Sequence, residues 1–338
     1  MVQQILLTGG SGVVGQALLK QLAAEPSTDY QMICLTRQRP LTNGNLMTIP
    51  GDICQSKLGL DDAMYKRLAT QVDWIIHAAA ITDFAQPFAA LRRCNVIGAR
   101  NMLAFAKAAN APMIHVSTAF VQPRRGHRFN AYELSKREAE AVVQQSDVPV
   151  TIVRPSIIVG DSATGCICKQ QGMHRIMSLL LEGVLPVVPG SPAARIDFVP
   201  QDRVAAALLA LLRHQRTGGE YWLTAGQDAL SLQDGLDILF DHGSHLLQRA
   251  IVKPRLVSAA AFAATLRQNQ RLVLSAHQRQ QVEESMGLFH YMTMSETFPT
   301  SFSRLYEEIG LAALPDPQLT FQRTLEYMIN YNREKARP

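Results

Sequence analysis

Residues 3–15 read Gln-Gln-Ile-Leu-Leu-Thr-Gly-Gly-Ser-Gly-Val-Val-Gly, an apolar run that leads directly into a glycine-rich turn. Gly9, Gly12 and Gly15 stand three residues apart, which allows a tight turn, close approach to a pyrophosphate and close helix packing. Helical periodicity follows, with one apolar face formed by Val13, Val14, Ala17, Leu18 and Leu22. The stretch predicts a strand, a turn and a helix whose first amides face a dinucleotide phosphate. The alternative is the same arrangement without a ligand.

The composition is that of a globular protein of ordinary enzyme size. The chain has 338 residues, 47% of them hydrophobic and 18% charged, which suffices for one large or two moderate domains. The formal net charge of +5 comes without a dense Lys/Arg block, so we do not expect nucleic acid as a partner. No apolar run reaches the ~20 residues needed to span a bilayer. The start lacks the basic region of a signal peptide, and the five cysteines lack metal-site spacing, so we expect a cytoplasmic protein without a metal.

The end of the second predicted strand, residues 31–36, indicates which dinucleotide binds. An acidic residue about 20 positions past the glycines would hold the ribose 2′-hydroxyl of NAD, whereas an arginine accommodates the 2′-phosphate of NADP. The chain has Thr36 and Arg37 at this point and no carboxylate. Because a guanidinium matches the geometry of a phosphate, we expect NADP(H). The alternative is a solvated surface arginine.

Strands and helices alternate through the first half of the chain. Further buried strands are predicted at residues 46–49, 72–77, 112–118 and 148–154, and a long helix at 87–109. We therefore predict an α/β fold, a doubly wound parallel Rossmann sheet with a smaller, mostly helical C-terminal substrate domain. We assign residues 1–157 and 197–225 to the NADP-binding domain and residues 158–196 and 226–338 to the substrate-binding domain.

A second informative stretch surrounds Tyr132 and Lys136, four residues apart at the start of a predicted helix. This spacing places both side chains on one helix face. An ammonium beside a phenol favours the phenolate, so we expect Lys136 to lower the pKa of Tyr132 toward the range of a general acid or base. The preceding strand ends in Ser117 and Thr118, which add hydroxyl groups. Taken without this context, the pair would be an ordinary surface contact.

Six short motifs together resemble the extended short-chain dehydrogenase/reductases. In chain order they are residues 8–15, 51–53, 77–80, 116–119, 132–136 and 154–156. The resemblance implies that Thr118 supplies the catalytic hydroxyl, with Ser117 as the alternative, that Tyr132 donates a proton, and that Lys136 binds the nicotinamide ribose.

The same resemblance implies a set of cofactor-binding residues along the chain. Asp52 and Ile53 would contact the adenine, while Pro155, Ser156 and Ile157 would lie at the nicotinamide end. The full candidate set is Gly9, Ser11, Gly12, Val13, Val14, Gly15, Arg37, Asp52, Ile53, His77, Ala78, Ala79, Ser117, Tyr132, Lys136, Pro155, Ser156 and Ile157. Thr82, Phe120 and Asp161 are the candidate substrate-binding residues.

Within that superfamily, residues 115–121, 153–165 and 197–200 look like the thioester reductase and fatty acyl-CoA reductase branch. The branch implies NADPH-dependent reduction of an acyl thioester, carried on coenzyme A or a carrier protein, to an aldehyde or onward to an alcohol. One alternative keeps the same triad and acts on a ketone, secondary alcohol or nucleotide sugar. The other is a non-catalytic NADP-binding sensor. The sequence predicts no oligomeric state.

Overall fold

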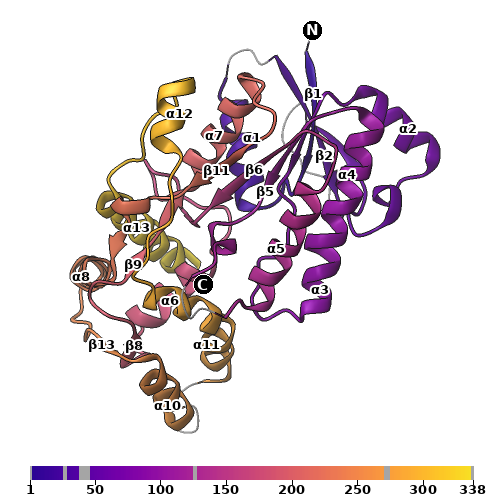
Figure 1. The fold of residues 1–338 in the computed structure, drawn as a ribbon. Helices are drawn as coiled ribbons and strands as arrows, with labels where there is room; N and C mark the ends of the chain where they lie inside the picture. Colours follow the sequence, from indigo (N-terminus) through magenta and orange to yellow (C-terminus); the bar gives the residue numbers. More distant parts are fainter. Residues whose placement is uncertain (1, 26–28, 38–45, 125–127, 270–274, 336–338) are drawn as a thin grey trace. The chain divides into compact units, whose positions relative to one another are not determined.

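The computed structural model describes the chain except for residues 1, 26–28, 38–45, 125–127, 270–274 and 336–338 (Figure 1). It contains two compact units, each built from several segments. The first unit comprises Met1–Pro155, Asp202–Leu223 and Ser301–Ala312. The second comprises Ser156–Gln201, Thr224–Thr300 and Ala313–Pro338.

Among the described residues, the first unit contains a seven-stranded sheet in the order β11-β6-β5-β4-β1-β2-β3. Every neighbouring pair of these strands is parallel. The strands are β1 (Gln3–Thr8), β2 (Tyr30–Thr36), β3 (Met47–Pro50), β4 (Trp74–His77), β5 (Met113–Val116), β6 (Val150–Pro155) and β11 (Glu220–Leu223). The predicted doubly wound parallel sheet is therefore confirmed.

Helices accompany these strands, and most of them lie in the crossovers that parallel pairing requires. They are α1 (Val13–Ala23), α2 (Asp62–Gln71), α3 (Phe88–Arg92), α4 (Gly98–Ala109), α5 (Ala131–Gln144), α7 (Gln201–Arg213) and α12 (Phe302–Ile309), with the short 3₁₀ turns η1 (Ser56–Gly59) and η3 (Ala119–Val121). The single helix predicted at residues 87–109 is instead α3 and α4 joined through a π-helical turn, η2 (Arg93–Ile97). Such turns occur often at functional sites.

A hydrophobic core packs against this sheet. Leu6, Ile75 and Met113, from three adjacent strands, belong to the same buried cluster as Met102 and Phe105 of α4. Side chains alternate between the two faces of a strand, so these three residues mark the sheet face that α4 covers. The core therefore packs α4 against these three strands.

The chain reverses direction across the sheet beside β1. From β1 it proceeds outward through β2 and β3, and it then returns to β4 on the other side of β1. In open parallel sheets, ligands bind outside the carboxyl ends of the strands at this kind of switch point. Gly9 follows β1 and Ala78 follows β4. The turn predicted to contact the phosphate and the segment predicted to contact the cofactor therefore both lie at this point.

The second unit consists of helices with three short strand pairs among its described residues. The pairs are β10 with β7, β12 with β9, and β13 with β8. The strands are β7 (Ile157–Val159), β8 (Val187–Pro189), β9 (Arg195–Ile196), β10 (Phe198–Pro200), β12 (Leu230–Ser231) and β13 (Arg255–Val257). The helices and helical turns are α6 (Gly172–Leu181), η4 (Gly226–Asp228), α8 (Leu232–Asp237), η5 (Ile238–His242), α9 (Gly243–Leu247), α10 (Ala259–Asn269), α11 (Ala276–Phe289), η6 (His290–Thr293) and α13 (Pro317–Lys335).

The unit boundaries differ from the predicted domain boundaries. The first unit ends at Pro155 and resumes at Asp202, and it includes Ser301–Ala312, which the sequence analysis placed in the second domain. The reason is local pairing with β11. Ser301 N donates to Trp222 O at 2.8 Å, and Trp222 N donates to Ser301 Oγ at 2.9 Å. These bonds hold the returning segment against an edge strand whose backbone would otherwise face solvent.

Candidate active site

The glycine-rich turn after β1 is shaped by close backbone contacts. Gly9 has φ +77°, and a Cβ at this residue would lie 2.7 Å from the backbone of Ala78 and Ala79. A Cβ at Gly15 would lie 2.4 Å from Gly9 O, whereas one at Gly12 would meet only Gly9 O at 3.2 Å. Gly9 and Gly15 therefore shape the turn itself, and Gly12 faces more open space.

Helix α1 begins at Val13 without a side-chain cap and without an acidic residue in its first turn. The first amides of a helix need partners, and an uncapped N-terminus favours an anion. Gly12, Val13 and Val14 stand at this helix start, with Ser11 directly before them. These residues fit the pyrophosphate of a dinucleotide, as the sequence predicts.

His77 was predicted to bind the cofactor, but its imidazole lies in the core, where it bonds a strand neighbour. Its Nδ1 lies 2.7 Å from Thr8 Oγ1, and the side chain is buried. Burial lowers the pKa of His77 to about 3, so the ring is neutral. The Thr8 hydroxyl also accepts a hydrogen bond from Ala79 N at 3.3 Å. His77 thus links β4 to β1 through Thr8. The backbone of Ala78 and Ala79 lies beside Gly9 at the switch point.

Arg37 is exposed at the end of β2 and lies near Asp52. Burial opposes ionisation of Asp52, but hydrogen bonds from Cys54 and the charge of Arg37 leave its pKa below the usual range. Asp52 accepts the backbone N–H of Cys54 at 2.9 Å, and Ile53 is buried against Gly98. The structure therefore places the Arg37 guanidinium close enough for its charge to act on the Asp52 carboxylate.

Tyr132 lies in the first turn of α5, which a capping box of Asn130 and Glu133 starts. The Tyr132 side chain is buried, and its hydroxyl bonds that of Thr118. Burial raises the pKa of Tyr132 to about 12, and the Thr118 bond only partly offsets this. The expected lowering of this pKa is therefore wrong, because desolvation by burial raises it and the charge of Glu133 adds to the rise.

Lys136 follows one helical turn later and is also buried. Its Nζ donates to the backbone oxygen of Val116, the last residue of β5, at 2.8 Å. Burial lowers the pKa of Lys136 to about 8, while the charge of Glu140 raises it. The ammonium thus keeps most of its charge at neutral pH and is fixed at the end of β5.

The two hydroxyl residues after β5 differ in what they reach. Thr118 is extended, caps η3 and bonds Tyr132. Ser117 Oγ is buried and has no hydrogen-bond partner among the described residues. The geometry therefore favours Thr118 as the hydroxyl of the set.

We predict that Thr118→Val lowers turnover by ~100-fold or more, since it removes the hydroxyl that is predicted to donate a hydrogen bond to the substrate oxygen. Ser117→Ala is the matched change on the neighbouring residue and leaves turnover near the wild-type value. Steady-state kinetics of both variants decide the point, and the reverse order of effects would assign the role to Ser117.

The predicted substrate-binding residues lie in different places. Thr82 is exposed, and Phe120 is buried under the guanidinium of Arg124, 5.7 Å from its ring centroid. Both belong to the first unit. Asp161 belongs to the second unit, where it accepts hydrogen bonds from Ala163 N and Thr164 N at 3.1 Å. Asp161 therefore closes its own turn, a role that its short spacing to these amides explains.

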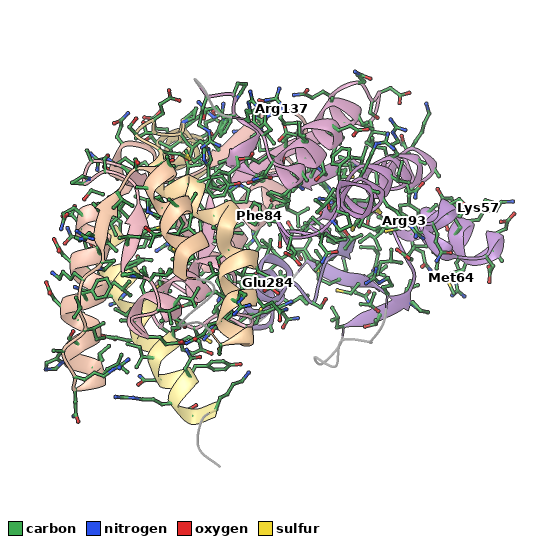
Figure 2. All side chains as sticks on the ribbon, turned by 90° about the horizontal axis from the view of Figure 1, so that it is seen from below. Lys57, Met64, Phe84, Arg93, Arg137 and Glu284 are labelled. Atoms are coloured by element: carbon green, nitrogen blue, oxygen red, sulfur yellow. The ribbon has the colours of Figure 1, made fainter. Side chains whose placement is uncertain are left out.

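The three predicted residues at the nicotinamide end span the unit boundary. Pro155 ends β6, whereas Ser156 and Ile157 begin the second unit, with Ile157 paired to Phe198. Sequence reasoning missed Phe84, whose ring meets that of Tyr132 edge to face at 5.1 Å (labelled in Figure 2). An aromatic residue in a loop carries no periodic signal, so only the fold identifies this contact.

Asn95 and Arg124 also support the site. Asn95, in the π turn, bonds both backbone groups of Ile81 and donates to Ser135 Oγ at 2.9 Å. Arg124 pairs with Glu133 at 3.3 Å, and both side chains are buried. Asn95 ties the loop after β4 to α5, and Arg124 ties the loop after η3 to the same helix.

The sequence profile of the male sterility protein family of NAD-binding domains matches residues 38–130 and 126–208. The chain belongs to this family. It is an NAD(P)-dependent oxidoreductase of the extended short-chain dehydrogenase/reductase type, with a nicotinamide dinucleotide as cofactor.

Curated relatives are much longer than this chain. The isonitrile lipopeptide synthase of Streptomyces coeruleorubidus is 27% identical over 303 residues, covering 77% of this chain and 20% of that protein. Glycine betaine reductase ATRR of Emericella nidulans is 29% identical over 253 residues, covering 61% and 20%. The chain thus spans about a fifth of the length of these relatives.

Solved structures share the fold. The terminal R domain from the myxalamid PKS-NRPS biosynthetic pathway has a TM-score of 0.78 at 21% identity, covering 98% of this chain and 92% of that one. The Bordetella bronchiseptica enzyme WbmG, solved in complex with NAD, has a TM-score of 0.67 at 18% identity, covering 98% and 95%.

His, Cys, Asp and Glu side chains form no group of three that could hold a metal ion in the described part of the chain. Over the same residues, we find no helix with both the length and the apolarity that a membrane crossing requires.

Proposed function

We propose that this protein uses NADPH to reduce an acyl thioester, carried on a carrier protein or coenzyme A, to an aldehyde or onward to an alcohol. The observation that carries the proposal is the contact between the hydroxyls of Tyr132 and Thr118, with the Lys136 ammonium one turn away. Carbonyl reduction needs two donors at the substrate oxygen and a proton source, and this set supplies both.

The roles follow from the chemistry of each side chain. When bound, the nicotinamide supplies the hydride for the carbonyl carbon. Thr118 and Tyr132 donate hydrogen bonds to the carbonyl oxygen as negative charge develops, and Tyr132 gives up its proton. The resulting hemithioacetal then collapses: its C–S bond breaks, the hydroxyl proton leaves, and the carrier thiol and the aldehyde are released. Because burial raises the pKa of Tyr132 to about 12, the phenol retains its proton until the substrate takes it. Lys136 would bind the nicotinamide ribose and stabilise the phenolate that remains.

The thioester as substrate is supported by the names of similar proteins. The fold matches an R domain of a PKS-NRPS pathway and a thiolation-reductase di-domain from an archaeal non-ribosomal peptide synthetase. The family profile also covers residues 115–121 and 153–165, which carry the thioester reductase resemblance. These likenesses favour a carrier-bound acyl group over a free ketone.

Substrate assays test the proposal directly. The protein is incubated with NADPH and acyl-CoA or acyl-carrier thioesters, while loss of NADPH absorbance and trapped aldehyde are measured. Turnover of a thioester with aldehyde release supports the proposal. If ketones, secondary alcohols or nucleotide sugars react and no thioester does, the thioester assignment is wrong while the triad stands.

The preference for NADPH rests on Arg37. We predict that Arg37→Ala weakens NADPH binding by ~10-fold or more, the effect of losing a hydrogen bond to a charged group. NADH affinity should change little, because NADH lacks the 2′-phosphate. Fluorescence titration with both nucleotides measures this, and Arg67→Ala, an exposed residue of α2, is the control. Equal losses for both nucleotides would refute the assignment.

A further inference from the structure

A buried carboxylate lies one helical turn beyond Lys136. Tyr132, Lys136 and Glu140 are spaced by four residues along α5, so they share one face of the helix. The Glu140 side chain is 7% exposed and that of Lys136 is also buried. A buried carboxylate is costly unless other groups compensate its charge. Other groups must therefore compensate the charge of Glu140.

Arg154 holds this carboxylate in a fixed position. Its Nε lies 2.9 and 3.1 Å from the two Glu140 oxygens, and its Nη2 lies 2.5 Å from Oε2. The guanidinium also stacks over Trp222, 4.6 Å from the ring centroid. Its remaining nitrogen, Nη1, pairs with Glu220, whose side chain is 44% exposed. Arg154 thus clamps one buried and one exposed carboxylate.

The other groups around Lys136 carry no negative charge. His77 on β4 and His115 on β5 both have a lowered pKa because they are buried, and both are neutral. Cys94 on η2 has a raised pKa because of burial and is a neutral thiol. Arg154 on β6 is positive, and its charge contributes to the lowered pKa of His115. Among the described groups that act on Lys136, Glu140 is the one anion at neutral pH.

We propose that Glu140 is a positioning residue for the reaction: its carboxylate, clamped by Arg154, keeps the buried Lys136 ammonium protonated beside Tyr132. The inference rests on the proposed role of Lys136 at the nicotinamide ribose. A neutral amine there would neither hold the ribose strongly nor stabilise a phenolate. Burial already lowers the pKa of Lys136 to about 8, so loss of Glu140 would remove its charge near physiological pH.

Glu140→Gln and Glu220→Gln form a matched pair that tests this inference. Each removes one carboxylate from the same guanidinium, but only the first faces Lys136. The pKa of Lys136 is measured in the nucleotide-free protein from the pH dependence of its ¹³Cε NMR signal. We expect it near 8 in the wild type and in Glu220→Gln, and lower by ~1 unit or more in Glu140→Gln, the usual effect of a neighbouring charge. The pH at which NADPH affinity falls should move with it.

Glu140→Asp is the rescue variant, since it keeps the charge. The pKa of Lys136 in Glu140→Asp should lie between those of the wild type and Glu140→Gln, because the shorter side chain moves the charge without removing it. Glu140→Asp replaces Glu140→Gln in the experiment if the Gln variant does not fold, as judged by thermal unfolding. An unchanged Lys136 pKa in Glu140→Gln, or equal shifts in both Gln variants, would overturn the inference. A different result would contradict the proposed function, namely a wild-type protein that binds NADPH but reduces no thioester. The two outcomes can be told apart because the NMR titration needs neither nucleotide nor substrate.

Discussion

Replacing Tyr132 by phenylalanine lowers turnover by at least ~100-fold, because the substrate oxygen loses its proton donor. Nucleotide affinity should stay within about 2-fold of the wild type, since the ring keeps its place and only one hydroxyl is lost. The ring contact with Phe84 does not involve the hydroxyl, so the variant should fold normally. Steady-state rates and a fluorescence titration with NADPH measure the two effects.

Tyr65→Phe is the matched control for this experiment. Tyr65 lies on α2, and its ring packs edge to face against Phe105 at 5.3 Å, as Tyr132 packs against Phe84. The same deletion of one hydroxyl should leave turnover unchanged at this position. An undiminished rate in Tyr132→Phe would remove Tyr132 from the mechanism and leave Thr118 as the donor to examine.

Gly12→Ala and Gly15→Ala should separate nucleotide binding from folding. A Cβ at Gly12 meets only Gly9 O at 3.2 Å, so the variant should unfold within ~1 kcal/mol of the wild type. Its methyl group would occupy space that the pyrophosphate needs, and NADPH affinity should fall at least ~10-fold, or about 1.4 kcal/mol. A Cβ at Gly15 lies 2.4 Å from Gly9 O and 2.6 Å from Gly10 Cα, so this variant should lose ~2 kcal/mol or more of unfolding free energy.

Chemical denaturation and NADPH titration distinguish the two glycine variants. Normal NADPH affinity in a folded Gly12→Ala protein would show that the dinucleotide phosphate does not lie over this turn. A stable Gly15→Ala protein would mean instead that the turn can move away from α1, which the close backbone contacts argue against.

The sequence predicted the framework because the framework depends on local signals. The apolar run at residues 3–8, the glycine spacing and the periodicity of α1 each depend on neighbours a few positions away. The doubly wound parallel sheet followed from the alternation of such segments, and the structure confirms it. The i, i+4 spacing of Tyr132 and Lys136 likewise needs only a helix, so their shared face could be predicted before the fold was known.

The surroundings of three predicted residues could not be read from the sequence. His77 follows the fourth strand as a cofactor contact would, yet its imidazole bonds Thr8 within the core. The pKa of Tyr132 rises although a lysine stands four residues away. Asp161, a candidate substrate-binding residue, accepts hydrogen bonds from two amides of its own turn. In each case the residue type was informative, but its burial and partners come from other strands.

Sequence alone determined the strand, turn and helix that are predicted to hold a dinucleotide and the order of the Tyr and Lys side chains, because both depend on spacings of a few residues. Only the tertiary structure decided that Gly9 meets Ala78, that Thr118 rather than Ser117 reaches Tyr132, and that Glu140 is clamped by Arg154. These contacts join residues far apart in the chain, and their energies depend on desolvation, which exists only once the core has formed.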